Sequence, residues 1–499
     1  MTPRYPSLYQ LNTRVLLTAL ASSLGRRATL DDFPDAEIDR LAALGFDWVW
    51  LLSVWSTGKA SQRVSRSLPE LRGEFEGTLP DLREDDIAGS GFAITGYSVH
   101  PALGGDAALA RLRARLARRG LKLMLDFVPN HTALDHPWVE EHPEYYVGGT
   151  ELDLAREPRN FTWARRRRGD RVMAYGRDPY FEGWSDTLQL DYANPATREA
   201  MAAELVKIAR QCDGVRCDMA MLVLPEVFER TWGRRAEPFW PAAAARVRET
   251  VPGFLLMAEV YWNLEWTMQQ QGFDYAYDKR LYDRLREGAA RAVREHLLAG
   301  LDYQDRLARF LENHDEPRAG ATFTPEAHKA AAVTTFLSPG LRFFHAGQLE
   351  GRRKKISPHL VRAPVEPVDR ELAAFYDRLL GVLRRPAVRD GRWQLLECLP
   401  AWDGNASADG FVASAWELDA ERLIVAVNQA AGRGQCQVRL PFTDLAGRSW
   451  RDAGRARPGR LRPRRLGAAG ARALSRRAGV ARLGLLADAG RVMSSRLLR

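Results

Sequence analysis

The stretch Leu121-Lys122-Leu123-Met124-Leu125-Asp126-Phe127-Val128-Pro129-Asn130-His131 starts as an apolar run of strand length and ends in polar residues. Three later segments also end in polar residues, and the last two follow apolar runs: Gly214-Val215-Arg216-Cys217-Asp218, Ala258-Glu259-Val260-Tyr261 and Asn313-His314-Asp315. Helix-patterned segments lie between them, which favours parallel strands. Polar residues at the carboxyl ends of parallel barrel strands indicate chemistry rather than packing. We therefore expect four strand ends to meet at one pocket.

The residue types at these strand ends suit cleavage of a glycosidic bond. This reaction needs one carboxylate at the anomeric carbon and one carboxylic acid that protonates the departing oxygen. Arg216 lies two residues before Asp218, and on a strand this spacing puts both side chains on one face, where the guanidinium keeps the carboxylate ionised. Glu259 has no Arg or Lys beside it in the sequence, which suits an acid with a raised pKa.

Each of these segments also has a structural interpretation. Arg216 and Asp218 alone would be read as a buried ion pair, and His131 or His314 alone as a core histidine with satisfied hydrogen bonds. Tyr97, in Gly96-Tyr97-Ser98-Val99, also fits simple packing. The joint occurrence of the four segments in this order favours the catalytic interpretation for the whole set.

Taken together, the four segments resemble those of the α-amylase superfamily, glycoside hydrolase family 13, over roughly residues 5 to 450. The resemblance implies a (β/α)₈ barrel that acts on α-glucosidic bonds with retention. It implies that Asp218 is the nucleophile, that Glu259 is the acid/base, and that Asp315 is the third carboxylate, which stabilises the transition state.

The resemblance also implies residues that bind the sugar before the cleavage point. His131 and His314 correspond to the paired histidines that hydrogen-bond this sugar, and Tyr97 to the aromatic platform beneath it. Asp126 corresponds to the aspartate that opens the first motif and shapes the pocket, and Arg216 to the arginine beside the nucleophile.

The sequence departs from the family pattern on the acceptor side and at the metal. Asp218 is followed by Met219-Ala220, where starch-degrading amylases often carry Lys-His, so contacts beyond the cleavage point differ. Asn130 lies where some members bind a structural calcium, but residues 132 to 185 offer no convincing set of oxygen ligands. We therefore expect no required metal and no cofactor.

The organisation of the chain follows from its length and patterning. With 499 residues it accommodates one barrel with appended modules. We expect the barrel in residues 1–131 and 186–385, a small insertion domain in 132–185, a C-terminal β-sandwich in 386–450, and a tail in 451–499. Leu11 to Leu20 suits the first barrel strand, and Gly272 to Tyr275 the sixth.

The tail carries the positive charge of the chain. Residues 451–499 contain 14 Arg and 2 Asp, whereas the whole chain has a net charge of +10, so the preceding 450 residues have a net charge of −2. The tail lacks aromatic residues for base stacking and any nucleic-acid-binding motif, which argues against a nucleic-acid partner. The tail does not continue the β pattern of the preceding residues, which stops near Trp450, so we interpret the tail as a disordered extension or the product of a frame shift.

The remaining sequence features favour a cytoplasmic enzyme. Four Cys without metal spacing suggest reduced structural thiols, and the apolar run Val15 to Leu20 is too short for a secretion signal or a membrane span.

The expected substrate is an α-glucan or a small α-glucoside. Transglycosylation would use the same residues as hydrolysis, and a non-catalytic carbohydrate-binding protein is the third hypothesis. The sequence leaves the oligomeric state open.

Overall fold

A closed barrel of eight parallel strands forms the centre of the molecule, as predicted from the sequence. The computed structural model describes residues 3–442, 449–452, 481–487 and 492–498. Around the barrel the strands follow the order β1-β14-β13-β12-β11-β10-β5-β2. Their bounds are β1 Ser7–Asn12, β2 Trp48–Leu52, β5 Lys122–Phe127, β10 Gly214–Cys217, β11 Leu255–Ala258, β12 Tyr275–Tyr277, β13 Leu307–Arg309 and β14 Leu341–His345.

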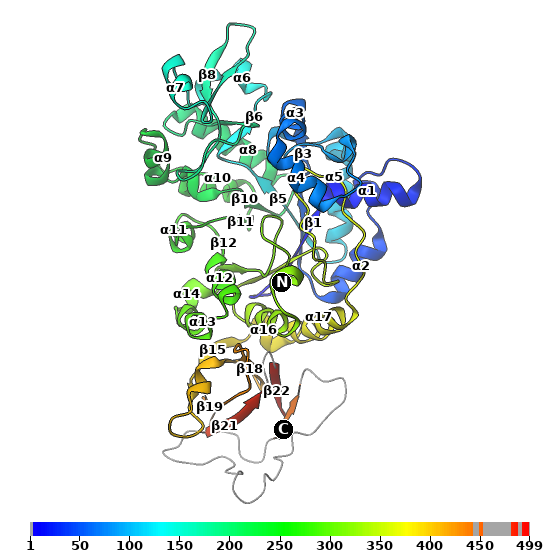
Figure 1. Ribbon diagram of the computed structural model, residues 1–499, viewed down its shortest axis with the longest axis vertical. Coiled ribbons are helices and arrows are strands. Elements are labelled where there is room, and N and C mark those ends of the chain that lie inside the picture. Colours follow the sequence, from blue (N-terminus) through cyan, green and yellow to red (C-terminus); the bar gives the residue numbers. More distant parts are fainter. Residues whose placement is uncertain (1–2, 443–448, 453–480, 488–491, 499) are drawn as a thin grey trace, which may run out of the picture.

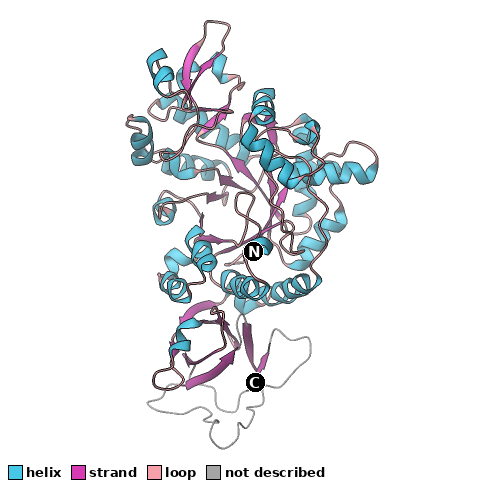
Figure 2. Cartoon of the chain, viewed as in Figure 1, coloured by secondary structure: helices cyan, strands magenta, loops and turns pink. Residues whose placement is uncertain are grey.

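Helices alternate with these strands along the chain (Figures 1 and 2). They are α1 Thr13–Leu24, α2 Asp35–Leu44, α5 Gly105–Ala117, α8 Pro195–Ala209, α9 Pro225–Trp232, α10 Trp240–Thr250, α11 Glu265–Gln270, α12 Lys279–Glu287, α13 Ala290–Leu297, α14 Leu301–Gln304, α15 Ala319–Thr322, α16 Pro325–Phe336, α17 Arg370–Leu383 and α18 Pro386–Asp390. Short 3₁₀ helices occur at Leu30–Asp32, Glu84–Asp86, Pro101–Leu103, Pro143–Tyr145, Ala220–Val223 and Ala406–Gly410.

Two predicted strands are placed differently in the structure. The first strand, predicted at Leu11 to Leu20, lies at Ser7–Asn12, and the apolar residues that follow belong to α1. The Asn12 side chain accepts the Val15 N–H and so caps this helix, which ends the strand. The sixth strand is β12 at Tyr275–Tyr277, so it begins where the predicted strand ended.

Two long excursions leave the barrel near the predicted pocket. The first, between β2 and β5, holds β3 Trp55–Thr57, α3 Lys59–Ser67, α4 Pro69–Thr78 and β4 Ile94–Val99. The second follows β5 and forms the upper end of the molecule in Figure 1. Its elements are β6 His131–Ala133, α6 Trp138–Glu141, α7 Glu151–Arg156, β7 Phe161–Ala164, β8 Arg171–Ala174 and β9 Thr187–Gln189. Because β6 pairs with β9, the base of this insertion extends slightly beyond residues 132–185.

Antiparallel sheets lie at the opposite end (Figure 1). One sheet has the strand order β15-β17-β18-β22-β20 and the other β16-β19-β21. The bounds are β15 Arg392–Leu396, β16 Cys398–Leu399, β17 Phe411–Leu418, β18 Glu421–Asn428, β19 Gly434–Leu440, β20 Ser449–Asp452, β21 Ala481–Ala487 and β22 Val492–Leu498. Trp416 of β17 is fully buried and donates its indole N–H to the Leu337 carbonyl after α16, which joins this region to the barrel.

The structure differs from the prediction for the tail. β21 and β22 lie within 451–499 and pair with β19 and β18, so the β pattern continues beyond Trp450. Backbone hydrogen bonds hold both strands in these sheets, which the arginine-rich composition of the tail as a whole did not indicate. Residues 453–480, 488–491 and 499 lie outside the described residues. In the described part of the chain, no helix combines the length and apolar content needed to cross a membrane.

Candidate active site

Strand register brings the predicted carboxylates together at one end of the barrel. In the ladder Arg216 of β10 lies opposite Asp126 of β5 and Met257 of β11. Beyond the strand ends, the Asp218 N–H donates to the Phe127 carbonyl and the Glu259 N–H donates to the Cys217 carbonyl. These bonds fix the backbone positions of Asp218 and Glu259 on adjacent strands.

Arg216 is the hub of this cluster. Its guanidinium is 1% exposed and donates from Nη1 to Asp218 Oδ1 at 2.7 Å and from Nη2 to Glu259 Oε2 at 2.6 Å. Weaker ion-pair contacts join Nη1 to Asp126 Oδ1 at 3.5 Å and Nη2 to Asp315 Oδ2 at 3.9 Å. The sequence predicted the contact with Asp218 but placed Glu259 away from any cation. The structure corrects this, because one fork of N–H donors holds both carboxylates.

The pKa of Glu259 lies near neutrality. Its side chain is buried, and this burial raises its pKa to about 7, with Asp218 and Asp315 adding to the effect and Arg216 opposing it. Oε2 accepts the Met219 N–H at 2.7 Å, and Oε1 accepts the Tyr261 hydroxyl at 2.8 Å. Met219 adopts a φ of 41°, in the left-handed region, and so turns its N–H toward Glu259.

The other two carboxylates of the predicted catalytic set differ in exposure. Burial raises the pKa of Asp218 above its usual range and Arg216 opposes this rise. Asp315 has a 40% exposed side chain, so the cluster opens to solvent at this residue. Burial would raise the pKa of Asp315 too, but the nearby His314 and Arg216 outweigh it and hold this pKa below the usual range.

His314 is oriented by the barrel wall. Its Nδ1 lies 2.9 Å from the Gln10 amide nitrogen, so Nδ1 accepts and Nε2 faces Asp315 Oδ2 at 3.0 Å. A turn places the two residues: the Asn313 side-chain oxygen accepts the N–H groups of Asp315 and Glu316. In the Asn-His-Asp triplet, Asn313 therefore holds the turn, while His314 and Asp315 contact one another.

Phe92 is a site residue that the sequence reasoning missed. Its half-buried ring lies 5.5 Å from the His314 ring at an angle of 31° and 5.1 Å from the Arg216 guanidinium carbon. The predicted platform, Tyr97, is 3% exposed, and its hydroxyl is bonded to the backbone of Val128 as both donor and acceptor. Tyr97 packs in the core against Trp55, so its expected platform role is replaced by packing.

Asp126 and His131 complete the predicted set. Burial raises the pKa of Asp126 to about 6 although Arg216 opposes this, and the Trp50 indole N–H lies 3.3 Å from its Oδ2. His131 is buried with its ring edge-on to Trp184 at 5.2 Å, and burial lowers its pKa to about 4. His131 is therefore a neutral hydrogen-bonding group at physiological pH.

Comparison with known proteins identifies the family. Residues 36–361 match the family described as the catalytic domain of alpha amylase, which is more than half of the chain. The chain belongs to the alpha-amylase family. It is 28% identical over 284 residues to alpha-amylase MalA of Haloarcula japonica, covering 55% of this chain and 38% of that protein. It is 24% identical over 307 residues to alpha-amylase 3 of Dictyoglomus thermophilum, covering 56% and 57%.

Solved alpha-amylase structures share the fold. The maltogenic alpha-amylase AmyB of Thermotoga neapolitana superposes with a TM-score of 0.68 at 17% identity, over 100% of both chains. An alpha-amylase of Geobacillus thermoleovorans in complex with acarbose gives 0.67 at 18% identity, covering 100% of this chain and 99% of that one. The matched part of this chain spans 38% of the length of the Haloarcula amylase and 57% of the length of the Dictyoglomus amylase.

The described residues of this chain form no recognisable metal-binding site. Among these residues, no three or more His, Cys, Asp and Glu side chains gather in a way that could hold a metal ion. Asn130, the position of calcium ligands in some members, exchanges hydrogen bonds with the Gln189 side-chain amide instead. The absence of a required metal stays a prediction.

Proposed function

We propose that this chain is a retaining glycosidase that cleaves α-glucosidic bonds of an α-glucan or a small α-glucoside by double displacement. The observation that carries the proposal is the Arg216 fork, which holds Asp218 and Glu259 side by side. Retaining enzymes need two carboxyl groups close enough to act on one anomeric carbon, whereas inverting enzymes leave room between them for a water molecule.

In the proposed reaction Asp218 attacks the anomeric carbon while Glu259 gives its proton to the departing glycosidic oxygen. The glycosyl-enzyme then forms, and Glu259, now ionised, takes a proton from an incoming water whose oxygen displaces Asp218. The pKa of about 7 keeps a large fraction of Glu259 protonated for the first step near neutral pH. Arg216 favours the ionised form of Asp218, which the attack requires.

The sugar-binding roles follow from position. Asp315, the most open of the carboxylates, is proposed to bind ring hydroxyls, with His314 and His131 as hydrogen-bonding partners. Phe92 takes the platform role, since its ring is half-buried beside His314 and Arg216. Flat aromatic faces cover the apolar faces of sugar rings. We also propose the domain division of the sequence analysis, with a barrel in 1–131 and 186–385, an insertion in 132–185 whose base extends to the β6–β9 pair, and a C-terminal domain from 386.

Transglycosylation is a second candidate function, and the residues that follow Asp218 and Glu259 in the sequence favour it. Met219 and Ala220 follow the proposed nucleophile where starch-degrading members often carry Lys-His, and Ala220 is fully buried. Trp262, three residues after Glu259, packs edge-on against Tyr180 at 5.0 Å, and the Arg230 guanidinium lies over both rings. An aromatic wall of this kind could bind a sugar acceptor in place of water.

The products separate the two candidates. We expect the full chain to convert at least one of maltooligosaccharides, starch, sucrose and trehalose, and Glu259→Gln to lower the rate by about 10²- to 10⁴-fold, because it removes the proton donor. Chromatography of all products is the measurement. Shorter oligosaccharides with glucose or maltose identify a hydrolase, and longer products identify a transferase. Equal activity in the Glu259→Gln variant would refute the proposed acid/base.

A further inference from the structure

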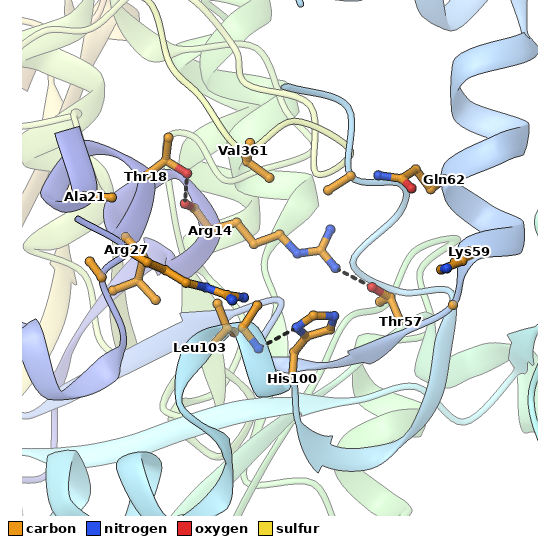
Figure 3. Close-up of a pocket in the computed structure, with 15 residues that line it drawn as sticks. Arg14, Thr18, Ala21, Arg27, Thr57, Lys59, Gln62, His100, Leu103 and Val361 are labelled. Carbon is orange, nitrogen blue, oxygen red and sulfur yellow. Dashed lines mark hydrogen bonds between the residues drawn. The ribbon is translucent and has the colours of Figure 1, made fainter. Parts of the chain in front are cut away.

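A cavity separate from the carboxylate cluster is lined by several basic side chains. It has a volume of about 480 Å³ and lies between α1, the start of α3 and the segment around His100 (Figure 3). Four of its lining residues are basic: Arg14, Arg27, Lys59 and His100. Among the described residues that line it, none is Asp or Glu. The lining itself therefore carries positive charge only, while the Asp135 carboxylate lies beside Gly58 without lining the cavity.

Arg14 is the deepest of these basic groups. It is 8% exposed, and it donates from Nη1 to the Gly89 carbonyl at 2.7 Å and from Nη2 to Thr57 Oγ1 at 3.0 Å. Both acceptors are neutral. Burial alone lowers the pKa of Arg14 to about 10, and no carboxylate opposes this effect. By contrast, the charge of the buried Arg216 is compensated by carboxylates. A buried guanidinium without an anionic partner is costly unless an anion supplies the missing charge.

His100 adds a directed donor beside Arg14. Its Nδ1 accepts the Ala102 N–H at 3.0 Å, so the neutral ring carries its proton on Nε2. Burial lowers the pKa of His100, and the charges of Arg14 and Arg27 lower it further. Figure 3 shows the side chains of Arg14, Arg27 and His100 directed into the same space.

The remaining walls give the cavity its size and character. Arg27 and Lys59 are exposed, so they stand where the cavity opens to solvent. Apolar residues form another part of the wall, among them Leu17, Leu103 and Val361. The volume falls in the range of about 300–1,000 Å³ that is typical of small-molecule sites. This volume is larger than a single inorganic anion fills, so we expect a ligand with an uncharged part, such as a carbon skeleton, in addition to its anionic group.

We propose that this cavity binds a small phosphorylated metabolite, with its phosphate between Arg14, Arg27 and His100 and its body against the apolar wall. A phosphomonoester carries a charge of about −1.5 to −2 near neutral pH and presents three acceptor oxygens. Guanidinium groups match such oxygens with paired donors. The cavity shares no lining residue with the carboxylate cluster, so this binding is separate from the proposed reaction.

The test is isothermal titration calorimetry of the full chain with glucose 6-phosphate, inorganic phosphate and glucose. We expect glucose 6-phosphate to bind with one site per chain, inorganic phosphate to bind more weakly, and glucose to give no signal at the same concentrations. Replacing Arg27 and Lys59 together by Gln should weaken glucose 6-phosphate binding by about tenfold or more, because two charges at the opening are lost. Both residues are exposed, so this variant should fold normally.

The matched control is Arg26→Gln with Arg118→Gln, which also removes two exposed charges but none that lines the cavity. It should bind glucose 6-phosphate as the unmodified chain does. No binding of either phosphate compound, or equal weakening in the control, would overturn the proposal. Equal affinities for inorganic phosphate and glucose 6-phosphate would identify free phosphate as the ligand and overturn the part that concerns a metabolite.

Discussion

Asp218→Asn should abolish turnover and leave substrate binding nearly intact. The substitution keeps the shape of the side chain but removes the negative charge that attacks the anomeric carbon, and loss of a nucleophile lowers kcat by about 10⁴-fold or more. The amide can still accept from Arg216, whose Nη1 lies 2.7 Å from Asp218 Oδ1. The measurement is kcat on the preferred donor together with calorimetric binding of the same sugar.

The matched control is Asp39→Asn on α2, where an exposed carboxylate pairs with Arg119 at the surface. This variant should keep full activity. Turnover retained by Asp218→Asn would contradict the assignment of the nucleophile. Loss of binding along with loss of turnover would instead mean that Asp218 mainly positions the sugar.

Replacement of Arg216 should change both stability and pH dependence. Arg216→Met leaves Asp218, Glu259 and Asp126 buried without their shared cation, and removal of one partner of a buried ion pair costs about 3–5 kcal/mol. Arg216 is the main opposite charge that lowers the pKa of each of these three carboxyl groups. Without it, the pKa values of Asp218 and Glu259 rise further.

The direction of the pH shift follows from these pKa values. Activity needs Asp218 ionised, which sets the acid limb, and Glu259 protonated, which sets the basic limb. Because both pKa values rise, the whole profile of kcat/KM should move to higher pH. Arg216→Lys keeps a charge but cannot contact both carboxylates at once, so we expect an intermediate shift and a loss of about 10²-fold in kcat.

Arg342→Lys provides the control for Arg216. Arg342 is fully buried as well, but it donates to the backbone carbonyls of Phe336, Tyr5 and Val388 rather than to carboxylates. Its replacement should lower the melting temperature without moving the pH profile. A pH profile that stays in place in both Arg216 variants would show that this residue does not set the two pKa values.

The barrel was predictable because its signal is repeated. Apolar runs such as 121–125 end at polar residues, and this recurs at several strand ends, so errors in single elements do not change the topology. The first strand was misplaced because Leu16, Leu17 and Leu20 fit a strand or a helix equally well by composition. Only the cap at Asn12 separates the two, and its geometry is set by the fold.

Most residues of the candidate site could be predicted from the sequence, but most of the contacts between them could not. Spacing in the sequence predicted the pairing of Arg216 with Asp218, because Asp218 directly follows the strand that holds Arg216. The contact of Arg216 with Glu259 crosses to a neighbouring strand, and its register is not visible in the sequence. Phe92 and Tyr97 lie five residues apart on one segment, and tertiary packing alone decides that the first faces His314 while the second enters the core.

The anomeric configuration of the first product tests the central claim most directly. Proton NMR of an early hydrolysis or transfer reaction distinguishes the α from the β anomer before mutarotation equilibrates them. Double displacement through Asp218 inverts the anomeric carbon twice, so the account predicts the α anomer first. Initial release of the β anomer would mean a single displacement by water and would contradict the proposed roles of Asp218 and Glu259.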